Sequence, residues 1–242
     1  MRQSSAEFTQ LLLKAGRGVG LPLGLAEDLV VPILWLQTCG LSGDLEALNV
    51  LTGLDEGRVP GVFPDLDTQP GGIATADEPI SAIYLAAAGC DSLQSGWPGP
   101  DTQVQLANVD RPLLAATALA LGHRKLNPEL ILNIETAHYV FSSSSEGEVI
   151  CLERQAQEHR TDTPGAGEVW LDASRTSINT AAGTMLVDAA RERQCHLDCE
   201  AKGLTADEKT LRGLKSLANR LLVPESERSL RFGAGAGIID SD

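Results

Sequence analysis

Apolar residues at helical spacing predict three short helices in the first part of the chain. The first opens with a capping box at Ser4 and Glu7, and the glycines that follow Lys14 are expected to end it. The second starts at Pro22, whose fixed φ suits a first helical turn, and we expect a kink at Pro32. The expected ranges are 4–14, 22–38 and 42–51, which together form a helical unit over residues 1–53.

The middle of the chain alternates between strand-like and turn-like composition. A hairpin is predicted where a polar stretch, Ser142–Gly147, separates two stretches with strand-like apolar residues, Leu130–Phe141 and Glu148–Leu152. Glu168–Leu171 is expected to form a further short strand, and the Ala-rich stretch Arg111–Gly122 a helix. The pattern leaves strand and helix open for 80–88 and 185–191, and it predicts loops over 55–72 and 92–102.

The last predicted helix is the most regular element. It covers Thr205–Leu222, with Thr205 as the cap, Glu208 at the capping-box position and leucines at helical spacing, and Pro224 ends it. Together the elements predict an α+β fold, in which a helical N-terminal unit and a C-terminal helix surround a mixed, largely antiparallel sheet. No repeat or low-complexity linker divides the chain, so we expect one domain over residues 1–242. It would consist of a helical subdomain, 1–53, and a mixed body, 54–242, with a glycine-rich tail.

Composition and charge narrow the range of functions. A net charge of −14 and an aromatic content of 4% argue against nucleic-acid binding, which needs clustered Lys and Arg and rings for stacking. The same acidity argues against anionic membranes, and the longest apolar run, Leu29–Leu36, is too short to span a bilayer. The sequence begins without the pattern of a signal peptide. We therefore expect a cytoplasmic bacterial protein with no nucleic-acid or membrane partner.

The cysteines and histidines give no clear metal site. Cys195-His196-x-x-Cys199 resembles the spacing of metal ligands, but two cysteines one helical turn apart, without a second pair, supply too few ligands for structural zinc. We expect no metal and no organic cofactor. The motifs of common serine hydrolases, phosphate-loop nucleotide hydrolases and zinc proteases are absent from the sequence. The five cysteines are expected to be reduced thiols, most of them packed as small hydrophobic residues: Cys39, Cys90, Cys151, Cys195 and Cys199.

A glycine-rich segment around Arg17 is the first candidate for a binding site. It precedes the predicted start of the second helix, where backbone N–H groups and a guanidinium favour a carboxylate or phosphate. The alternative is a flexible loop with a solvated Arg17. Glu27, about one turn into the second helix, is the candidate catalytic residue: if it were buried beside Arg17, it would act as a general base or orient the guanidinium. The alternative is an ordinary acidic residue that complements the helix dipole.

The end of the chain carries the densest group of candidate ligand-binding residues. Guanidinium groups beside backbone N–H groups that are free of Cβ bulk can hold an anion. We expect the tail to be ordered and to pack against the N-terminal helical unit. The alternative is that Ser226 only caps a short helix and the tail arginines pair with the terminal acids. The candidate substrate-binding residues are Arg17, Ser226, Arg228, Ser229, Arg231, Gly233, Gly235 and Gly237.

Both ends of the chain resemble an uncharacterised bacterial family, domain of unknown function thirty-seven twenty-six. The tail reads Val-Pro-x-Ser-Glu-x-Ser-x-Arg, then Gly-Ala-Gly-Ala-Gly and a terminal Asp-x-Asp. The front, over residues 14–28, is similar to that family's Lys-Ala-Ala-Arg-Gly-Ala-Gly…Gly-Leu-Ala-Glu-Glu signature, and the chain departs from the family at Gly16 and Ser241. The resemblance implies no activity. It implies that the two ends are the parts that the family shares.

These observations predict a metabolic protein that acts on a small carboxylate-bearing molecule. The expected chemistry is acid–base catalysis of a lyase, isomerase or hydrolase type, and the chain could also form a homo-oligomer. The alternative is a non-catalytic ligand-binding or accessory protein, in which the same motifs hold a partner or seal a subunit interface. A concave pocket containing a carboxylate or histidine of shifted pKa would favour the enzyme, whereas a flat apolar junction would favour the accessory protein.

Overall fold

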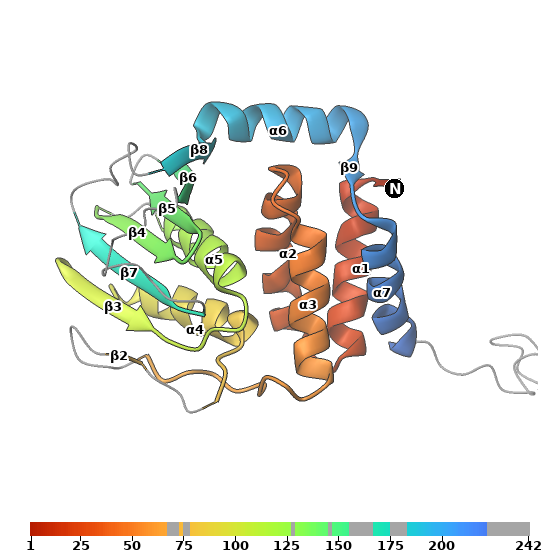
Figure 1. The fold of residues 1–242 in the computed structure, drawn as a ribbon, viewed down its shortest axis with the longest axis horizontal. Coiled ribbons are helices and arrows are strands. Elements are labelled where there is room, and N and C mark those ends of the chain that lie inside the picture. The colour runs from red at the N-terminus through yellow and green to blue at the C-terminus, as the bar shows by residue number, and fades with distance from the viewer. Residues whose placement is uncertain are drawn as a thin grey trace, which may run out of the picture.

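Four helices stand side by side in one half of the molecule (Figure 1). The computed structural model describes residues 1–66, 78–126, 129–144, 147–154, 167–174 and 183–221, together with the backbone of 73–74. The four helices are α1 (Ser5–Gly18), α2 (Leu23–Thr38), α3 (Gly43–Asp55) and α7 (Glu208–Ala218), and a short 3-10 helix, η2 (Asn219–Leu221), follows α7. The prediction of three N-terminal helices is confirmed, as is the capping box at Ser4.

The first helix does not end where the glycines begin, so that part of the prediction is wrong. It runs through Gly16 and ends at Gly18, because these positions allow two other helices to approach closely. A Cβ at Gly16 would lie 3.1 Å from the Cβ of Ala26 in α2, and one at Gly18 would overlap the carbonyl oxygen of Leu217 in α7. The family-like segment therefore serves at least to pack helices.

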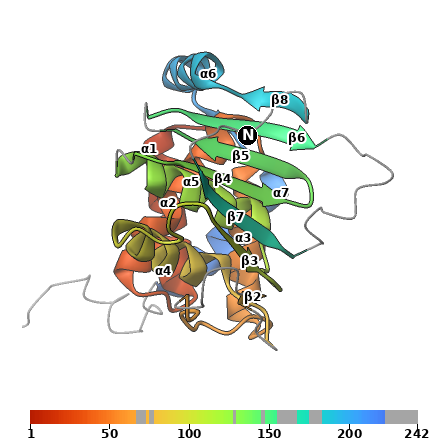
Figure 2. The ribbon, with the colours of Figure 1, turned by 90° about the vertical axis from the view of Figure 1, so that its left-hand side faces the viewer.

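The other half of the molecule contains a seven-stranded sheet with the order β2-β3-β7-β4-β5-β6-β8 (Figure 2). The β2–β3 pair is parallel and the other pairs are antiparallel, so the predicted α+β fold with a largely antiparallel sheet is confirmed. The strands are β2 (Ile73–Ala74), β3 (Thr102–Leu106), β4 (Ile131–Thr136), β5 (Tyr139–Ser143), β6 (Val149–Arg154), β7 (Val169–Ser174) and β8 (Gly183–Val187).

The predicted strand Leu130–Phe141 is in fact two strands. The chain turns at Ala137 and His138, and the backbone N–H of Tyr139 donates to Oγ1 of Thr136 at 3.0 Å to close the turn. β4 and β5 therefore pair with each other, and β5 continues to Ser143, inside the stretch predicted as a turn. The hairpin with β6 is confirmed, but it is the second of two consecutive hairpins.

Two helices join the sheet to the four-helix layer. α5 (Pro112–Lys125) packs against the sheet, α4 (Ala82–Gln94) packs against α5, and both contact α2. The stretch 80–88 is thus resolved as mainly helix. The stretch 185–191 contains both structures, since β8 ends at Val187 and α6 (Ala189–Lys202) begins two residues later.

Helix α6 was not predicted, and it crosses from the sheet to the helical layer (Figure 1). It leads to β9 (Leu204–Thr205), which pairs with β1 (Arg2–Gln3). Thr205 consequently lies in a strand and does not cap the last helix. That cap is Asp207, whose side chain accepts from the backbone N–H of Thr210 at 2.8 Å.

Glu192 is the one buried residue of α6, and it attaches the helix to the body. The indole Nε1 of Trp35 in α2 donates to its Oε1 at 2.7 Å. Nη1 of Arg124 in α5 donates to both carboxylate oxygens, at 2.8 and 3.0 Å. A buried carboxylate is stable only when it is paired and hydrogen-bonded, and these two donors meet that need.

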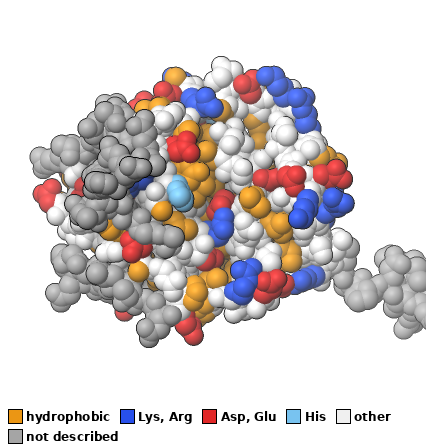
Figure 3. All heavy atoms as spheres, in the orientation of Figure 1, with side chains coloured by type: hydrophobic (Ala, Val, Ile, Leu, Met, Phe, Trp, Pro, Cys, Tyr) orange, Lys and Arg blue, Asp and Glu red, His pale blue; other side chains and the backbone are white. Residues whose placement is uncertain are grey.

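The described surface carries both signs of charge. On the face shown in Figure 3, acidic and basic side chains are interspersed over the helical half. Among the helices described, none has both the length and the apolar character needed to cross a bilayer.

Candidate functional site

The structure places the two candidate residues of the N-terminal segment at the surface. Arg17 lies in the last turn of α1, exposed, and its Nη1 donates to the carbonyl oxygen of Leu21 at 3.2 Å. Glu27 lies in α2 and is also exposed. The burial of Glu27 beside Arg17, on which its role as a base depended, is not found.

The other candidate residues lie outside the described part of the chain, which ends at Leu221. Their role in substrate binding, and the packing of the tail against the helical unit, stay predictions. The residues concerned are Ser226, Arg228, Ser229, Arg231, Gly233, Gly235 and Gly237.

A pocket of about 630 Å³ at the ends of α4 and α5 has the features of a ligand site. Its walls come from the loop after α4, from the last turn of α5 and from strands β4 and β7. Apolar side chains form most of the lining, which is the usual character of a small-molecule site. The lining residues are Leu93, Gln94, Gly96, Trp97, Pro98, Gly99, Pro100, His123, Leu126, Glu129, Leu130, Leu132 and Ala173.

His123 is the buried titratable group in this lining. It is 5% exposed and lies in α5 above the sheet row in which Ser143, Leu132 and Ala173 are paired across β5, β4 and β7. Its Nδ1 lies 3.1 Å from Oγ of Ser143, which is itself fully buried. Burial lowers the pKa of His123 to about 4, because it disfavours the charged imidazolium.

A histidine of this kind is neutral at physiological pH and can serve as a hydrogen-bonding group for a ligand. If the Ser143 hydroxyl donates to Nδ1, Nε2 carries the proton and is a donor; in the other tautomer Nε2 is an acceptor. Nε2 has no hydrogen-bond partner in the described part of the chain. The contact with Ser143 therefore holds the ring through Nδ1 and leaves Nε2 for a ligand in either tautomer.

The remaining polar groups of the pocket are few. Glu129 is exposed, and the buried indole Nε1 of Trp97 has no partner within the described ranges. No Lys or Arg lines this pocket in the described residues. The site thus suits a ligand that places an uncharged polar group beside the imidazole.

No local pattern in the sequence points to this site. His123 follows the predicted helix Arg111–Gly122 directly, but a histidine at the end of an apolar helix is more often a packed residue. What makes the site is the meeting of the end of α5 with Ser143, which lies in a stretch that the pattern assigns to a turn. A long-range contact of this kind has no signature in residue spacing.

We expect the low pKa of His123 to make stability depend on pH. The unfolded chain takes up a proton at this residue as the pH falls below its ordinary pKa of 6.5, whereas the folded chain does so only near 4. The free energy of unfolding therefore falls as the pH falls from about 6.5 to about 4, and above about pH 6.5 this residue causes no loss of stability. From about pH 7 to about pH 5 the loss is about 2 kcal/mol of unfolding free energy.

Urea denaturation at a series of pH values checks this. The His123→Gln variant should lose that part of the pH dependence, and His138→Gln, which removes an exposed histidine, should keep it. If the free energy of unfolding changes with pH by the same amount in the two variants, His123 titrates at its ordinary pKa in the folded protein.

The front of the chain matches a known family. The model of a family described as protein of unknown function (DUF3726) matches residues 3–72, which confirms the resemblance seen in the N-terminal signature. The matched range includes α1, α2 and α3, and the tail motif lies outside it.

Comparison with other known proteins adds little. A search of curated proteins finds no match. Among solved structures, the chain is similar to a malate dehydrogenase from Entamoeba histolytica, with 10% identity, a TM-score of 0.39, and coverage of 91% of this chain and 69% of the other. A likeness at this level supports no conclusion about fold or activity.

Proposed function

We propose that the protein is a metabolic enzyme that binds a small molecule in the His123 pocket and uses the imidazole in acid–base chemistry. One observation carries the proposal: a buried, neutral histidine lines a mostly apolar pocket, and one of its ring nitrogens has no partner among the described residues. Shifted titratable groups in a cleft are typical of catalytic sites, although structural networks also produce them.

The geometry supports chemistry next to a carbonyl group. A neutral imidazole held by a second residue can donate a hydrogen bond to a carbonyl oxygen and stabilise the charge that develops there. This role favours an isomerase or lyase over a hydrolase, because Ser143 is fully buried and cannot reach a substrate as a nucleophile. Glu129, exposed at the pocket, is the candidate for the second proton-transfer group.

The predicted carboxylate on the substrate needs a place outside the apolar part of the pocket. A buried carboxylate without a cation is strongly unfavourable, and the described lining offers none. We therefore propose that the carboxylate stays in solvent at the mouth, with the tail arginines as further candidates to hold it. A bacterial, cytoplasmic setting and activity without an organic cofactor are part of the same proposal.

A non-catalytic ligand-binding protein is the second candidate. It is favoured by the fact that only one titratable group in the described lining is buried, whereas acid–base catalysis commonly uses two. Such a protein would use His123 for recognition alone. Binding without turnover would distinguish it from the enzyme.

A matched panel of ligands tests the proposal. Short 2-oxo carboxylic acids, their amides and their reduced hydroxy counterparts are screened by thermal shift and then titrated against the natural protein. We expect carbonyl compounds to bind, and His123→Gln to weaken them about tenfold or more, the effect of losing one hydrogen bond of about 1.4 kcal/mol. His138→Gln should bind as the natural protein does.

Deuterium exchange then separates the two candidates. A bound carbonyl compound incubated with the enzyme in heavy water should gain deuterium at the carbon next to the carbonyl, as seen by NMR. If the natural protein catalyses this exchange and the His123→Gln variant does not, the result supports the enzyme. If the compound binds without exchange, the result supports the ligand-binding protein. If none of the panel binds, or if His123→Gln leaves binding unchanged, this pocket is not the site.

A further inference from the structure

The His123 pocket is much larger than the carbonyl group that the proposed function places beside the imidazole. Its volume is about 630 Å³, and pockets of about 300 to 1,000 Å³ usually hold a drug-sized ligand. A short 2-oxo acid would fill only a small part of this space and would leave the apolar walls in contact with water. The rest of the ligand should therefore be a larger apolar group.

The floor of the pocket belongs to the sheet and to α5. Leu132 and Ala173 line it, and they are paired across β4 and β7 in the row that continues to Ser143, the hydrogen-bonding partner of His123. Leu132 is fully buried, and Ala173 is 5% exposed. The imidazole is thus the polar group of an otherwise apolar floor.

The loop between α4 and β3 forms a wall of the pocket, to which it contributes Trp97 and two prolines. Backbone hydrogen bonds hold this loop at both ends. The N–H of Trp97 donates to the carbonyl oxygen of Ser92 at 3.1 Å, and the N–H of Asp101 donates to that of Ala173 at 2.8 Å. Trp97 also packs against the core. Because the wall is formed in advance, a ligand does not have to order it on binding.

The lining changes from apolar inside to polar at the solvent. Leu93 is buried and Leu130 is half-buried, whereas Gln94 and Glu129 are exposed. A ligand with a carboxylate at one end and an apolar group at the other matches this gradient. Burying apolar surface is favourable, whereas burying a carboxylate without a cation is strongly unfavourable.

We propose that the ligand carries an aromatic ring close to its carbonyl group, and that Trp97 selects this ring. The inference rests on the proposed function, since it takes the carbonyl group at Nε2 of His123 as given. Trp97, Pro98 and Pro100 supply rigid rings to the pocket wall. An aromatic ring that packs on another ring gains more than the area it buries would give. Trp97 is thus a specificity-determining residue, and His123 is the residue that meets the reacting group.

Three 2-oxo acids are the probes for the test: pyruvate, cyclohexylpyruvate and phenylpyruvate. They share the carbonyl and the carboxylate and differ in the apolar group. Isothermal titration calorimetry measures their affinities for the natural protein. We expect phenylpyruvate to bind about tenfold to a hundredfold more tightly than pyruvate, the effect of burying an apolar group of this size. Cyclohexylpyruvate should lie between the two, because it buries a similar area without contact between aromatic rings.

Substitution of Trp97 tests its role in this preference. Trp97→Leu should bind phenylpyruvate about tenfold more weakly and pyruvate about as the natural protein does. Trp97→Phe keeps a ring at this position and should retain most of the preference.

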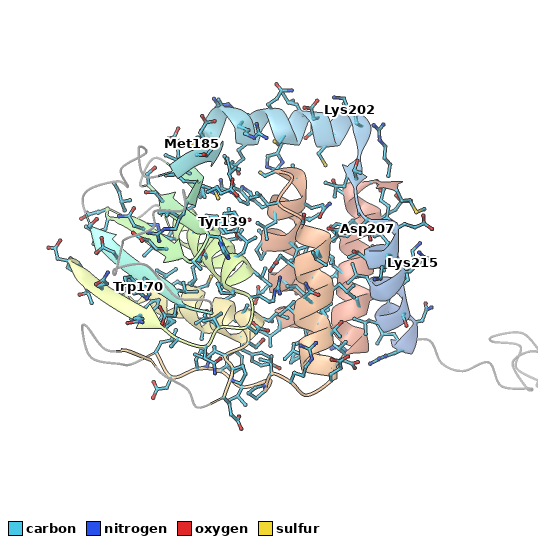
Figure 4. All side chains as sticks on the ribbon, in the orientation of Figure 1. Tyr139, Trp170, Met185, Lys202, Asp207 and Lys215 are labelled. Atoms are coloured by element: carbon cyan, nitrogen blue, oxygen red, sulfur yellow. The ribbon has the colours of Figure 1, made fainter. Side chains whose placement is uncertain are left out.

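Trp170→Phe is the matched control. Trp170 is also half-buried, and the Nε1 atoms of both indoles are buried without a partner in the described ranges. It does not line the pocket, and it lies on the sheet at the side away from the four-helix layer (Figure 4). Its substitution should change neither affinity.

NMR of the natural protein gives a result that does not depend on the folding of a variant. The indole signals of Trp97 should shift when phenylpyruvate is added, and those of Trp35 and Trp170 should not. If Trp97→Leu proves unfolded by circular dichroism, this measurement decides, and unmoved Trp97 signals would overturn the inference.

The outcomes separate this inference from the proposed function. If the three acids bind equally well, or if a folded Trp97→Leu variant keeps the preference, the inference is wrong. The proposed function then still stands, provided that His123→Gln weakens the binding of all three acids. If none of the three acids binds, the proposed function fails and the inference fails with it.

Discussion

Replacing Gly18 by alanine should lower the free energy of unfolding by about 3 kcal/mol. The new Cβ would overlap the carbonyl oxygen of Leu217, which belongs to the backbone of α7 and cannot move aside as a side chain can. Overpacking of this kind typically costs about 1 to 3 kcal/mol and forces the elements apart. The value lies at the upper end because α1 and α7 pack along most of their length.

Gly24→Ala is the matched control for this prediction. Gly24 lies in the same family-like segment and in a helix, but a Cβ there meets no atom within 4 Å. Alanine should therefore be neutral, or stabilise by up to about 1 kcal/mol because it favours the helix. Urea denaturation of both variants measures the difference, and a similar effect of the two would contradict the packing role of Gly18.

Replacing Glu192 by alanine should cost a similar amount, about 3 kcal/mol. The change leaves the Trp35 indole N–H and the Arg124 guanidinium without their acceptor. Removing one partner of a buried ion pair costs about 3 to 5 kcal/mol, and the low end applies because the Arg124 side chain keeps 28% of its surface exposed.

An ion pair on the solvent side of the same helix provides the control. Nζ of Lys202 lies 2.8 Å from Oδ1 of Asp198, with both side chains about half exposed. Asp198→Ala should cost less than about 1 kcal/mol, since exposed pairs contribute little. If the two variants unfold at the same urea concentration, Glu192 does not anchor α6 as described.

Helices α1, α2, α3, α5 and α7 and the β5–β6 hairpin could be predicted because their causes are local. Capping residues, leucine spacing and turn composition act over a few residues, and they placed α1, α2, α3 and the β5–β6 hairpin. The errors have tertiary causes. Gly16 and Gly18 would normally break a helix, yet here they are kept in one by the helices that pack on them. Helix α6 has no continuous apolar face, and only Glu192 is buried in it. Its sequence therefore lacks the apolar residues at helical spacing from which a helix is predicted.

The candidate site was still harder to predict from the sequence, because it depends entirely on tertiary contacts. Sequence reasoning named Arg17 and Glu27 as candidates because they stand beside glycines and a helix start, with a solvated Arg17 and a dipole-complementing Glu27 as the alternatives. Both side chains prove to be exposed. His123 owes its neutral state to burial, and it is hydrogen-bonded to Ser143; both features depend on how α5 meets the sheet. A single sequence shows neither burial nor contact over such a distance.

NMR of the histidine rings shows directly whether His123 is a neutral imidazole inside a ligand pocket. Protein with ¹⁵N-labelled histidine is titrated with acid and then, at about pH 7, with the 2-oxo acids and amides of the panel. We expect the ring signals of His123 to stay those of a neutral imidazole down to about pH 5 and to shift when a carbonyl compound binds, whereas the ring signals of His138 should not change with the ligand. A His123 ring that titrates at its ordinary pKa and is unmoved by every compound would contradict this expectation.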